Sequence, residues 1–406
     1  MFNLSSRGAA WLPGTGTQYF SCMKKFLFIA TAALSLAALA SCKKEESKTP
    51  APDPEITNES EIGEVPFTGG TVTYEFETNK AWSVTKYGAT QASAESYEVE
   101  ISPISGEAGK NTIKLTFPAN RTADAIEFAF TITLQKEENE ANPDGAPYTR
   151  EVKVTVPAPF ATDAAGNVYK AVYLKDGNYW MAENLRYVPD GATIGDDVKN
   201  VAAGVYYPVK LNEDHTALEF AKDEQTIKSA GYLYQGEVAL GVAINSIKSE
   251  EDAKKLEGTQ GICPEGWHIP TSTEIVNLVG KAVSFDTNEN APYYDADKKN
   301  ATIEKLNADG FNLSACGAVS IIDNTKTSGT LMGWLKANPN IVGSGYIYGS
   351  SFAGISYNTA NDPASGVKNV QFHGLMPMAT TGTANGSKVS YKIAASVRCV
   401  MNQPAE

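Results

Sequence analysis

The 406-residue sequence predicts two folded domains, an N-terminal all-β sandwich and a C-terminal α+β domain. Three observations lead to this fold class. Apolar and β-branched residues alternate with polar ones from residue 61 to 157, a Pro/Ala-rich segment follows at 158–165, and helix start signals occur only beyond it. We therefore expect a sandwich at 61–157, a linker at 158–165 and a second domain at 166–402.

The first domain contains successive segments that alternate with a period of two, and turns carrying Gly, Asn or Pro separate them about every ten residues. These segments read TVTYEFE, AWSVTKY, SYEVEIS, NTIKLTFP, EFAFTITLQ and TREVKVTV. Trp82 lies in one of them, so we expect it in the core rather than on a sugar-binding surface. The turn glycines, Trp82 and the turn Pro118–Asn120 resemble BACON-like and related modules, which implies an immunoglobulin-like sandwich.

The second domain contains a clear helix start. Thr271 followed three residues later by Glu274 forms a capping box, and Pro270 keeps the preceding chain extended. The residues after it form an apolar stripe at helical spacing: Ile275, Val276, Leu278, Val279 and Ala282. We expect two more helices, at Ser249–Leu256 and at Asn300–Ala308. Short strands between these helices complete the predicted α+β domain.

The N-terminal region predicts export. From Met23 the chain has two lysines, an apolar run of about fifteen residues and small residues before Cys42, too short a run for the roughly 20 residues of a membrane-spanning helix. We expect residues 1–41 to be a signal peptide whose true start is Met23. The segment resembles a bacterial lipoprotein signal, which implies acylation of Cys42, for example with palmitate. An ordinary secretory signal with a chance cysteine is the alternative.

Residues 42–60 are polar and rich in Pro, so we expect a lipidated, extended tether. The acidic residues directly after Cys42 resemble the surface-export signal of Bacteroidetes lipoproteins, which implies an outer-membrane protein that faces outward. Removal of residues 1–41 takes the net charge from −13 to about −16. This negative charge repels other anions, so it disfavours nucleic acid and anionic lipid as partners. We expect contact with the membrane only through the lipid anchor.

Several segments of the second half occur in a family-specific order. They are residues 163–187 with WMAENL, GYLYQ at 231–235, CPEGWHIPTSTEIVNL at 263–278, GSGYIYGSS at 343–351 and KIAASVRCV at 392–400. Together they resemble the Fibrobacter succinogenes major paralogous domain. The resemblance implies a secreted or surface protein with a C-type-lectin-like fold, and the family has no firmly assigned activity.

The resemblance also implies a disulfide between Cys263 and Cys399, which the oxidising compartment favours. The alternative is a free buried thiol at each position. Cys316 is left over, and we expect a small buried apolar side chain there. A redox pair of Cys316 with Cys263 is disfavoured, because fold-level analogy alone supports it.

Metal and hydrolytic sites find little support in the sequence. His215, His268 and His373 are isolated and lack the spacing of zinc ligands. The Asp/Asn-rich stretch at 286–300 lacks the spacing of a calcium loop. The sequence contains no Gly-x-Ser-x-Gly motif. We expect no metal, no cofactor and no enzymatic activity.

Binding is the remaining class of function. Tyr346, Tyr348 and Tyr357 lie in a Gly/Ser-rich stretch and Trp334 precedes it, so they are candidate ligand-binding residues, with a place in the core as the alternative. We expect a non-catalytic surface protein that binds a glycan or a host or partner protein and acts in adhesion. The alternatives are a fimbrial tip or other surface-complex subunit in contact with pilus subunits, and an enzyme of unknown type.

Overall fold

The computed structural model describes most of the chain after residue 51. The described residues are 52–89, 97–134, 147–197, 203–213, 218–244, 246–247, 252, 255–280, 288–295, 300–301, 303–312, 316, 318–322, 328–332, 344–348, 354–358, 369–373, 382–384, 387–389 and 391–402. Residues Ala51–Glu406 form one compact unit. Within it we call residues 52–157 the sandwich and residues 158–402 the C-terminal domain.

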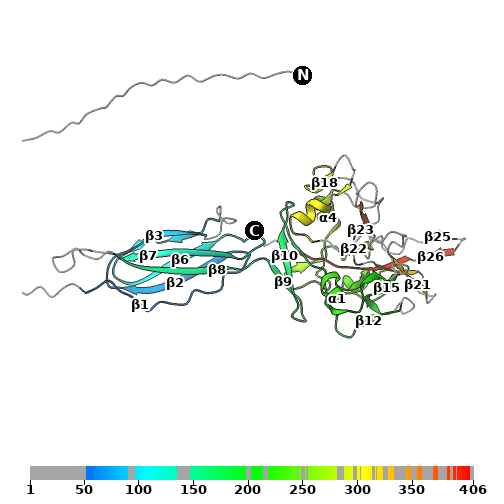
Figure 1. Cartoon of the computed structure of the whole chain (residues 1–406), viewed down its shortest axis with the longest axis horizontal. Helices are drawn as coiled ribbons and strands as arrows, with labels where there is room; N and C mark the ends of the chain where they lie inside the picture. Colours follow the sequence, from blue (N-terminus) through cyan, green and yellow to red (C-terminus); the bar gives the residue numbers. More distant parts are fainter. Residues whose placement is uncertain are drawn as a thin grey trace, which may run out of the picture. The chain divides into compact units, whose positions relative to one another are not determined.

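The sandwich consists of two four-stranded antiparallel sheets that face each other (Figure 1). The first has the order β1 (Ile56–Thr57), β2 (Gly70–Thr78), β6 (Gly109–Phe117), β4 (Glu100–Ser102). The second has the order β5 (Ser105–Gly106), β3 (Trp82–Ala89), β7 (Ile126–Leu134), β8 (Tyr148–Val156). The six alternating segments of the sequence correspond to β2, β3, β4, β6, β7 and β8, so the prediction of an all-β first domain is confirmed.

Apolar side chains at every second position of these strands form the core between the two sheets. In β7, every second residue from Ile126 to Leu134 is buried in the same cluster as Phe76 and Trp82. The Trp82 side chain is only 3% exposed and its ring lies edge-on to that of Phe76, with 5.0 Å between centroids. Each such buried side chain contributes about 1.5–3 kcal/mol. The expectation that Trp82 belongs to the core is confirmed.

Both ends of the predicted sandwich differ from the structure. Strand β1 and the residues after it belong to the fold: Glu59 accepts a hydrogen bond from Arg150, and Ser60 accepts one from the amide of Glu75. The sandwich therefore includes part of the segment 42–60 that we predicted to be a tether. The predicted linker at 158–165 contains a strand, β9 (Phe160–Thr162), that pairs with the next strand along the chain.

The C-terminal domain contains two larger sheets. A five-stranded antiparallel sheet has the order β17 (Trp267–His268), β28 (Val400–Met401), β11 (Tyr179–Met181), β10 (Val168–Tyr173), β9. A six-stranded sheet has the order β12 (Thr193–Gly195), β13 (Gly204–Tyr206), β16 (Leu233–Gln235), β27 (Tyr391–Ala395), β20 (Ala318–Ile322), β21 (Ser328–Met332). Both sheets thus join the last strands of the chain to segments far away in the sequence.

Smaller elements surround these sheets. The additional strands are β14 (Val209–Leu211) with β15 (Leu218–Phe220), β18 (Tyr294–Asp295) with β19 (Asn300–Ala301), β22 (Ser344–Tyr348) with β23 (Gly354–Asn358) and β24 (Asn369–His373), and β25 (Gly382–Ala384) with β26 (Ser387–Val389). The helices are α1 (Glu224–Ala230), α2 (Gly236–Ala239), α4 (Ser272–Val279) and α5 (Ile303–Ala308). Over the residues described, none of these helices has the length and apolarity to cross a membrane.

The prediction of an α+β, C-type-lectin-like C-terminal domain is wrong, because the domain is dominated by strands and its fold is all-β. Glycines end two of the four helices named above. Helix α1 stops at Gly231 (φ 69°) and α4 at Gly280 (φ 81°), a backbone region that other residues rarely adopt. Asn300–Ala301 pairs with β18, so the helix predicted at Asn300–Ala308 begins only at Ile303. Most of Ser249–Leu256 lies outside the described residues.

The sandwich and the C-terminal domain pack against each other through aromatic rings. The Phe67 ring of the sandwich lies 5.7 Å from that of Phe160 and 5.4 Å from that of Tyr179, measured between centroids. The Tyr179 hydroxyl donates to the carbonyl oxygen of Asn120 at 2.9 Å. Phe67 is thereby part of the apolar cluster of the C-terminal domain. The two domains share buried surface at this joint.

Candidate functional site

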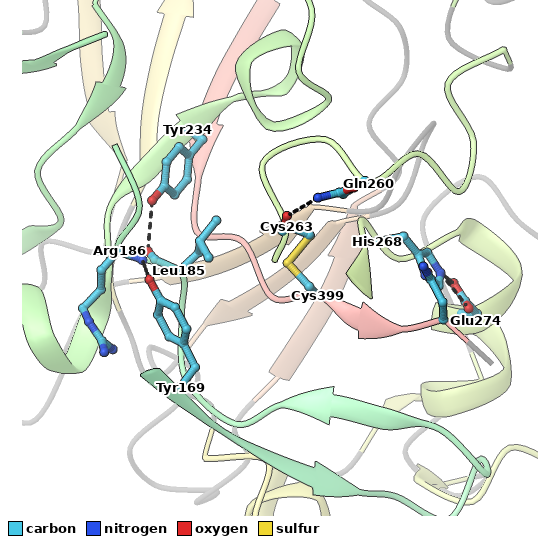
Figure 2. Close-up of a disulfide and its surroundings, with 10 residues drawn as sticks. Tyr169, Leu185, Arg186, Tyr234, Gln260, Cys263, His268, Glu274 and Cys399 are labelled. Carbon is cyan, nitrogen blue, oxygen red and sulfur yellow. Dashed lines mark hydrogen bonds and ion pairs between the residues drawn. A yellow bond between two sulfur atoms is a disulfide. The ribbon is translucent and has the colours of Figure 1, made fainter. Parts of the chain in front are cut away.

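The stretch 261–275, which holds Cys, Trp, His and Glu close together, contains a turn, the edge strand β17 of the five-stranded sheet and the start of helix α4. Cys263 and Cys399 form a disulfide with 5.9 Å between Cα atoms, and both side chains are buried in the main apolar cluster (Figure 2). The bond ties the turn before β17 to the segment before β28. The predicted disulfide is confirmed, and the alternative of two free thiols is excluded.

The predicted capping box is present at the start of α4. The Thr271 hydroxyl accepts from the amide of Glu274 at 3.1 Å, and Glu274 Oε2 accepts from the amide of Thr271 at 2.7 Å. His268 adds a third interaction, because its Nε2 lies 3.0 Å from the Glu274 carboxylate (Figure 2). On its other side His268 Nδ1 lies 2.7 Å from Asn402 Oδ1. Both ring nitrogens of His268 are thus engaged in holding β17, α4 and the end of β28 together.

The neighbours of this pair shift its titration. Burial by itself lowers the pKa of His268, but the hydrogen bond and charge of Glu274 outweigh it, and the pKa lies above its usual value. Burial raises the pKa of Glu274, but hydrogen bonds from His268 and Thr271 outweigh it, and the pKa lies below its usual value. Both shifts favour the charged pair. The pair is thus a hydrogen-bonded contact inside the domain that becomes an ion pair when His268 is protonated.

A second internal link joins WMAENL to SVRCV. The Arg398 side chain is 1% exposed and donates from Nε to Asn184 Oδ1 at 2.7 Å. Its other nitrogens donate to the carbonyl oxygens of Phe311 and, at 2.7 Å, Asn312. Asn184 in turn donates to the Ala230 carbonyl at 2.7 Å. One arginine therefore fixes three segments that are far apart in the sequence.

Burial lowers the pKa of Arg398 to about 9, because a guanidinium loses hydration in the interior. Its hydrogen bonds go to neutral oxygens, and its carbon lies 4.6 Å from the ring centroid of Phe311. This arrangement compensates the desolvated cation with dipoles and an aromatic face. The guanidinium serves as a structural cross-link.

Tyr169 and Tyr234 complete the cluster around the disulfide (Figure 2). The Tyr234 hydroxyl donates to the carbonyls of Leu185 (3.1 Å) and Tyr187 (2.7 Å). The Tyr169 hydroxyl donates to Asp163 at 2.5 Å and accepts from the amide of Arg186 at 2.9 Å. Burial and the hydrogen bond to Asp163 raise the pKa of Tyr169 well above its usual value. Both phenols are neutral structural groups at physiological pH.

A hollow of about 530 Å³ lies beside the disulfide. Residues Thr162–Ala164 line it from one side, residues Gln260–Glu265 from another, and Tyr187 completes the wall. Gln260 donates from Nε2 to the Cys263 carbonyl at 3.0 Å, which fixes this loop (Figure 2). The volume is within the range of pockets that hold small ligands. The hollow is a candidate binding surface of the C-terminal domain, and the CPEGWH segment supplies part of its wall although the sequence analysis placed no binding site there.

The candidate ligand-binding residues of the sequence lie elsewhere. Tyr346 and Tyr348 belong to β22 and Tyr357 belongs to β23, so they are on strands of a three-stranded sheet. Tyr357 pairs with Gly345, which places it at a register position on the face opposite to that of residues 346 and 348. Trp334 lies outside the described residues. The register does not put the three tyrosines on one face.

Of the other residues considered in the sequence analysis, some lie among the described residues and some do not. Cys42 and His215 lie outside the described residues, and His373 ends β24. Cys316 is buried and takes no part in the disulfide, as expected for a small apolar side chain. Over the described part of the chain, no three His, Cys, Asp or Glu side chains are placed to hold a metal ion.

The model of the Fibrobacter succinogenes major domain matches residues 176–401, which is more than half of the chain. The chain belongs to this family. WMAENL, CPEGWH and SVRCV all fall within the match, so the segments that carry the resemblance are also those joined by the disulfide and by Arg398.

Comparisons outside the family add little. No curated protein matches the chain. Among solved structures, the ASH/PapD-like domain 7 of human CEP192 is similar at 17% sequence identity, covering 31% of this chain and 96% of that chain, with a TM-score of 0.19. A similarity at this level supports no conclusion about this protein.

Proposed function

We propose that this protein of the Fibrobacter succinogenes major domain family is a lipid-anchored, outward-facing outer-membrane protein that binds a glycan or a partner protein without catalysis. Acylated Cys42 is the proposed anchor and the sandwich the proposed spacer. Support for the location comes from the signal-like segment that begins at Met23 and from the acidic residues after Cys42. The family match agrees with a surface protein.

One observation carries the non-catalytic part of the proposal. The reactive-looking side chains of the family segments, Arg398, Asn184, His268 and Glu274, have their hydrogen-bonding partners inside the domain. An active site requires such groups to meet a substrate in a concave site. In this chain they hold strands together, so recognition must use other surfaces. The hollow beside the disulfide and the strands that carry Tyr346, Tyr348 and Tyr357 are the surfaces we propose.

The anchor is tested by Cys42→Ser. We expect the wild-type protein in the outer-membrane fraction with an acylated N-terminal peptide, and the variant in a soluble fraction with an unmodified one. Protease added to intact cells should degrade the wild-type protein. A variant that stays membrane-bound would contradict lipid anchoring, and protection from protease would contradict surface exposure.

Binding is tested with the mature chain that carries Cys42→Ser. We expect it to bind a defined set on a glycan array or to retain a specific protein in a pull-down. Tyr187→Ala tests the hollow and Tyr348→Ala tests the strands; loss of binding with an unchanged melting temperature assigns the surface. Co-purification with pilus subunits would favour a fimbrial tip or complex subunit instead. Turnover of a bound glycan would contradict the proposal.

A further inference from the structure

A second hollow, of about 220 Å³, lies where the sandwich meets the C-terminal domain. Thr68 and Arg121 line it from the sandwich, and Tyr173, Tyr179, Met401 and Asn402 line it from the C-terminal domain. Arg121 is the charged residue of this lining, and no carboxylate belongs to it. A chain with a net charge of −13 thus presents a cationic hollow at this joint.

Several polar groups of this lining have capacity left for a ligand. Among the described residues, no hydrogen bond or ion pair engages the Thr68 hydroxyl, the Tyr173 hydroxyl or the guanidinium nitrogens of Arg121. The side-chain oxygen Oδ1 of Asn402 contacts His268, which leaves the Nδ2 group of the same amide open to a ligand. Unused donors that converge on one concave surface are typical of a ligand site. The side chains of Thr68, Tyr173 and Arg121 can all donate hydrogen bonds, and that of Arg121 is charged.

Arg121 already stacks on an aromatic ring before any ligand arrives. Its guanidinium carbon lies 4.7 Å from the ring centroid of Tyr173, so the aromatic ring occupies one face of the cation. This stacking leaves the N–H groups, which lie in the guanidinium plane, free for a bidentate acceptor. Tyr173 is itself held edge-on by Tyr179, with 5.0 Å between centroids.

The residue before Arg121 fixes the backbone. Asn120 is fully buried and donates from Nδ2 to the carbonyls of Asp124 (2.8 Å) and Pro157 (2.9 Å). Its amide donates to the Phe67 carbonyl at 2.7 Å, and its own carbonyl accepts from Tyr179. Arg121 therefore projects from a rigid turn. Such preorganisation lowers the entropy lost when a ligand binds.

We propose that this hollow binds the carboxylate-bearing sugar of an acidic glycan. Arg121 takes the carboxylate in a bidentate contact, and the hydroxyls of Thr68 and Tyr173 with the amide of Asn402 bind the sugar hydroxyls. The volume, small for a ligand pocket, suits one sugar ring at the end of a chain. This inference rests on the proposed function: it names one ligand class and adds a third surface, at the joint, to the two proposed above.

Isothermal titration of the mature Cys42→Ser chain tests the proposal with a galacturonate trisaccharide and, as the neutral match, its methyl ester. N-acetylneuraminate is the second acidic probe. We expect an acidic probe to bind about tenfold or more tightly than the ester, because a charge-assisted contact is worth about 1.5–3 kcal/mol. Arg121→Gln should remove this preference, and Tyr173→Phe should weaken binding several-fold while keeping the ring under Arg121.

Lys110→Gln is the matched control, since it removes one positive charge from an exposed position of β6 away from the hollow. It should bind as the wild type does. Equal affinity for acid and ester, or an Arg121→Gln variant with unchanged circular dichroism that binds normally, would overturn the site. If neutral glycans or a protein bind the chain while neither acidic probe does, this inference fails and the proposed function stands. If nothing binds, both fail.

Discussion

The sandwich and the C-terminal domain bury their apolar residues by different means. In the sandwich, nine-residue strands such as β2, β6, β7 and β8 pair along their whole length, and alternation supplies a continuous core. In the C-terminal domain, the strands of the two larger sheets are two to six residues long. Their partners are far apart in the sequence, as in the pairing of Trp180 with Val400. Its sheets pack on several separate apolar clusters and are cross-linked in addition by the disulfide and Arg398.

This difference predicts unequal responses to mutation. A continuous core distributes stability over many contacts, so the loss of one polar link should matter little. Short strands from distant segments pay loop-closure entropy for each pairing, so the links that hold them should matter more. The family segments of this chain thus mark the places where distant strands are tied together.

The largest expected effect comes from the disulfide. In Cys263→Ala/Cys399→Ala, the unfolded C-terminal domain regains the entropy of a long loop, which costs on the order of 5 kcal/mol as an upper figure. We expect denaturant unfolding of the C-terminal domain, followed by emission of Trp180, Trp267 and Trp334 in a Trp82→Phe background, to shift to lower denaturant. The midpoint of the sandwich, followed by emission of Trp82 in a chain with these three tryptophans replaced by Phe, should move much less. Equal shifts in both domains would break the comparison.

Arg398→Met should have the next largest effect. The change leaves the oxygens of Asn184, Phe311 and Asn312 without their donor in the interior, and we expect about 3 kcal/mol of destabilisation. Arg150→Met is the matched control in the sandwich, because Arg150 pairs with Glu59 at a half-exposed site and such pairs contribute about 0–1 kcal/mol. Equal losses in the two variants, measured by chemical denaturation, would contradict the contrast.

Removal of the helix cap tests a local contact in the C-terminal domain. Thr271→Ala deletes the hydroxyl that accepts from the Glu274 amide, which costs about 1 kcal/mol. Thr271→Ser keeps the hydroxyl and should be close to wild type. A Thr271→Ala melting temperature equal to that of the wild type would show that the cap does not limit stability.

The smallest effect is the pH dependence of the His268–Glu274 pair. The pKa of His268 is raised, so its contribution is complete below the usual value of 6.5 and is lost as the pH rises through the folded value. The pKa of Glu274 is lowered, so its contribution is present above 4.5 and is lost as the pH falls through its folded value. The pair therefore stabilises most between these usual values.

We expect the stability difference between wild type and His268→Gln to be largest between pH 4.5 and 6.5 and to stay below about 1 kcal/mol. It should shrink above the folded pKa of His268. Unfolding curves at a series of pH values measure this difference. A difference that grows toward alkaline pH has the wrong sign and would contradict the assignment of an ion pair.

Sequence reasoning succeeded where the signal is local. Alternation around Trp82 located the sandwich strands, and the spacing of Thr271 and Glu274 located a helix start. It failed where structure depends on distant partners: β9 lies in a segment that reads as a linker, because its partner β10 is needed to make it a strand. The α+β prediction overestimated helix for the same reason, since Asn300–Ala301 is extended only because it pairs with β18.

The contacts of Arg398 and Arg121 were missed for the same reason, because they depend on residues that are distant in the sequence. Arg398 stands between buried residues in the short segment that joins β27 to β28, but its partner Asn184 is 214 residues away. Arg121 and Tyr173 carry no motif, and only folding brings them to one hollow. The cysteine pairing followed from the family resemblance rather than from the spacing of the residues.

Hydrogen exchange of the mature chain, with and without the disulfide, tests most directly whether the short strands of the C-terminal domain need this cross-link, while the long paired strands of the sandwich do not depend on it. In Cys263→Ala/Cys399→Ala, we predict that amides of β10, β11, β16 and β27 lose protection, while those of β2, β6 and β7 keep theirs. Unchanged protection in the C-terminal strands, or equal loss in the sandwich, would contradict the account.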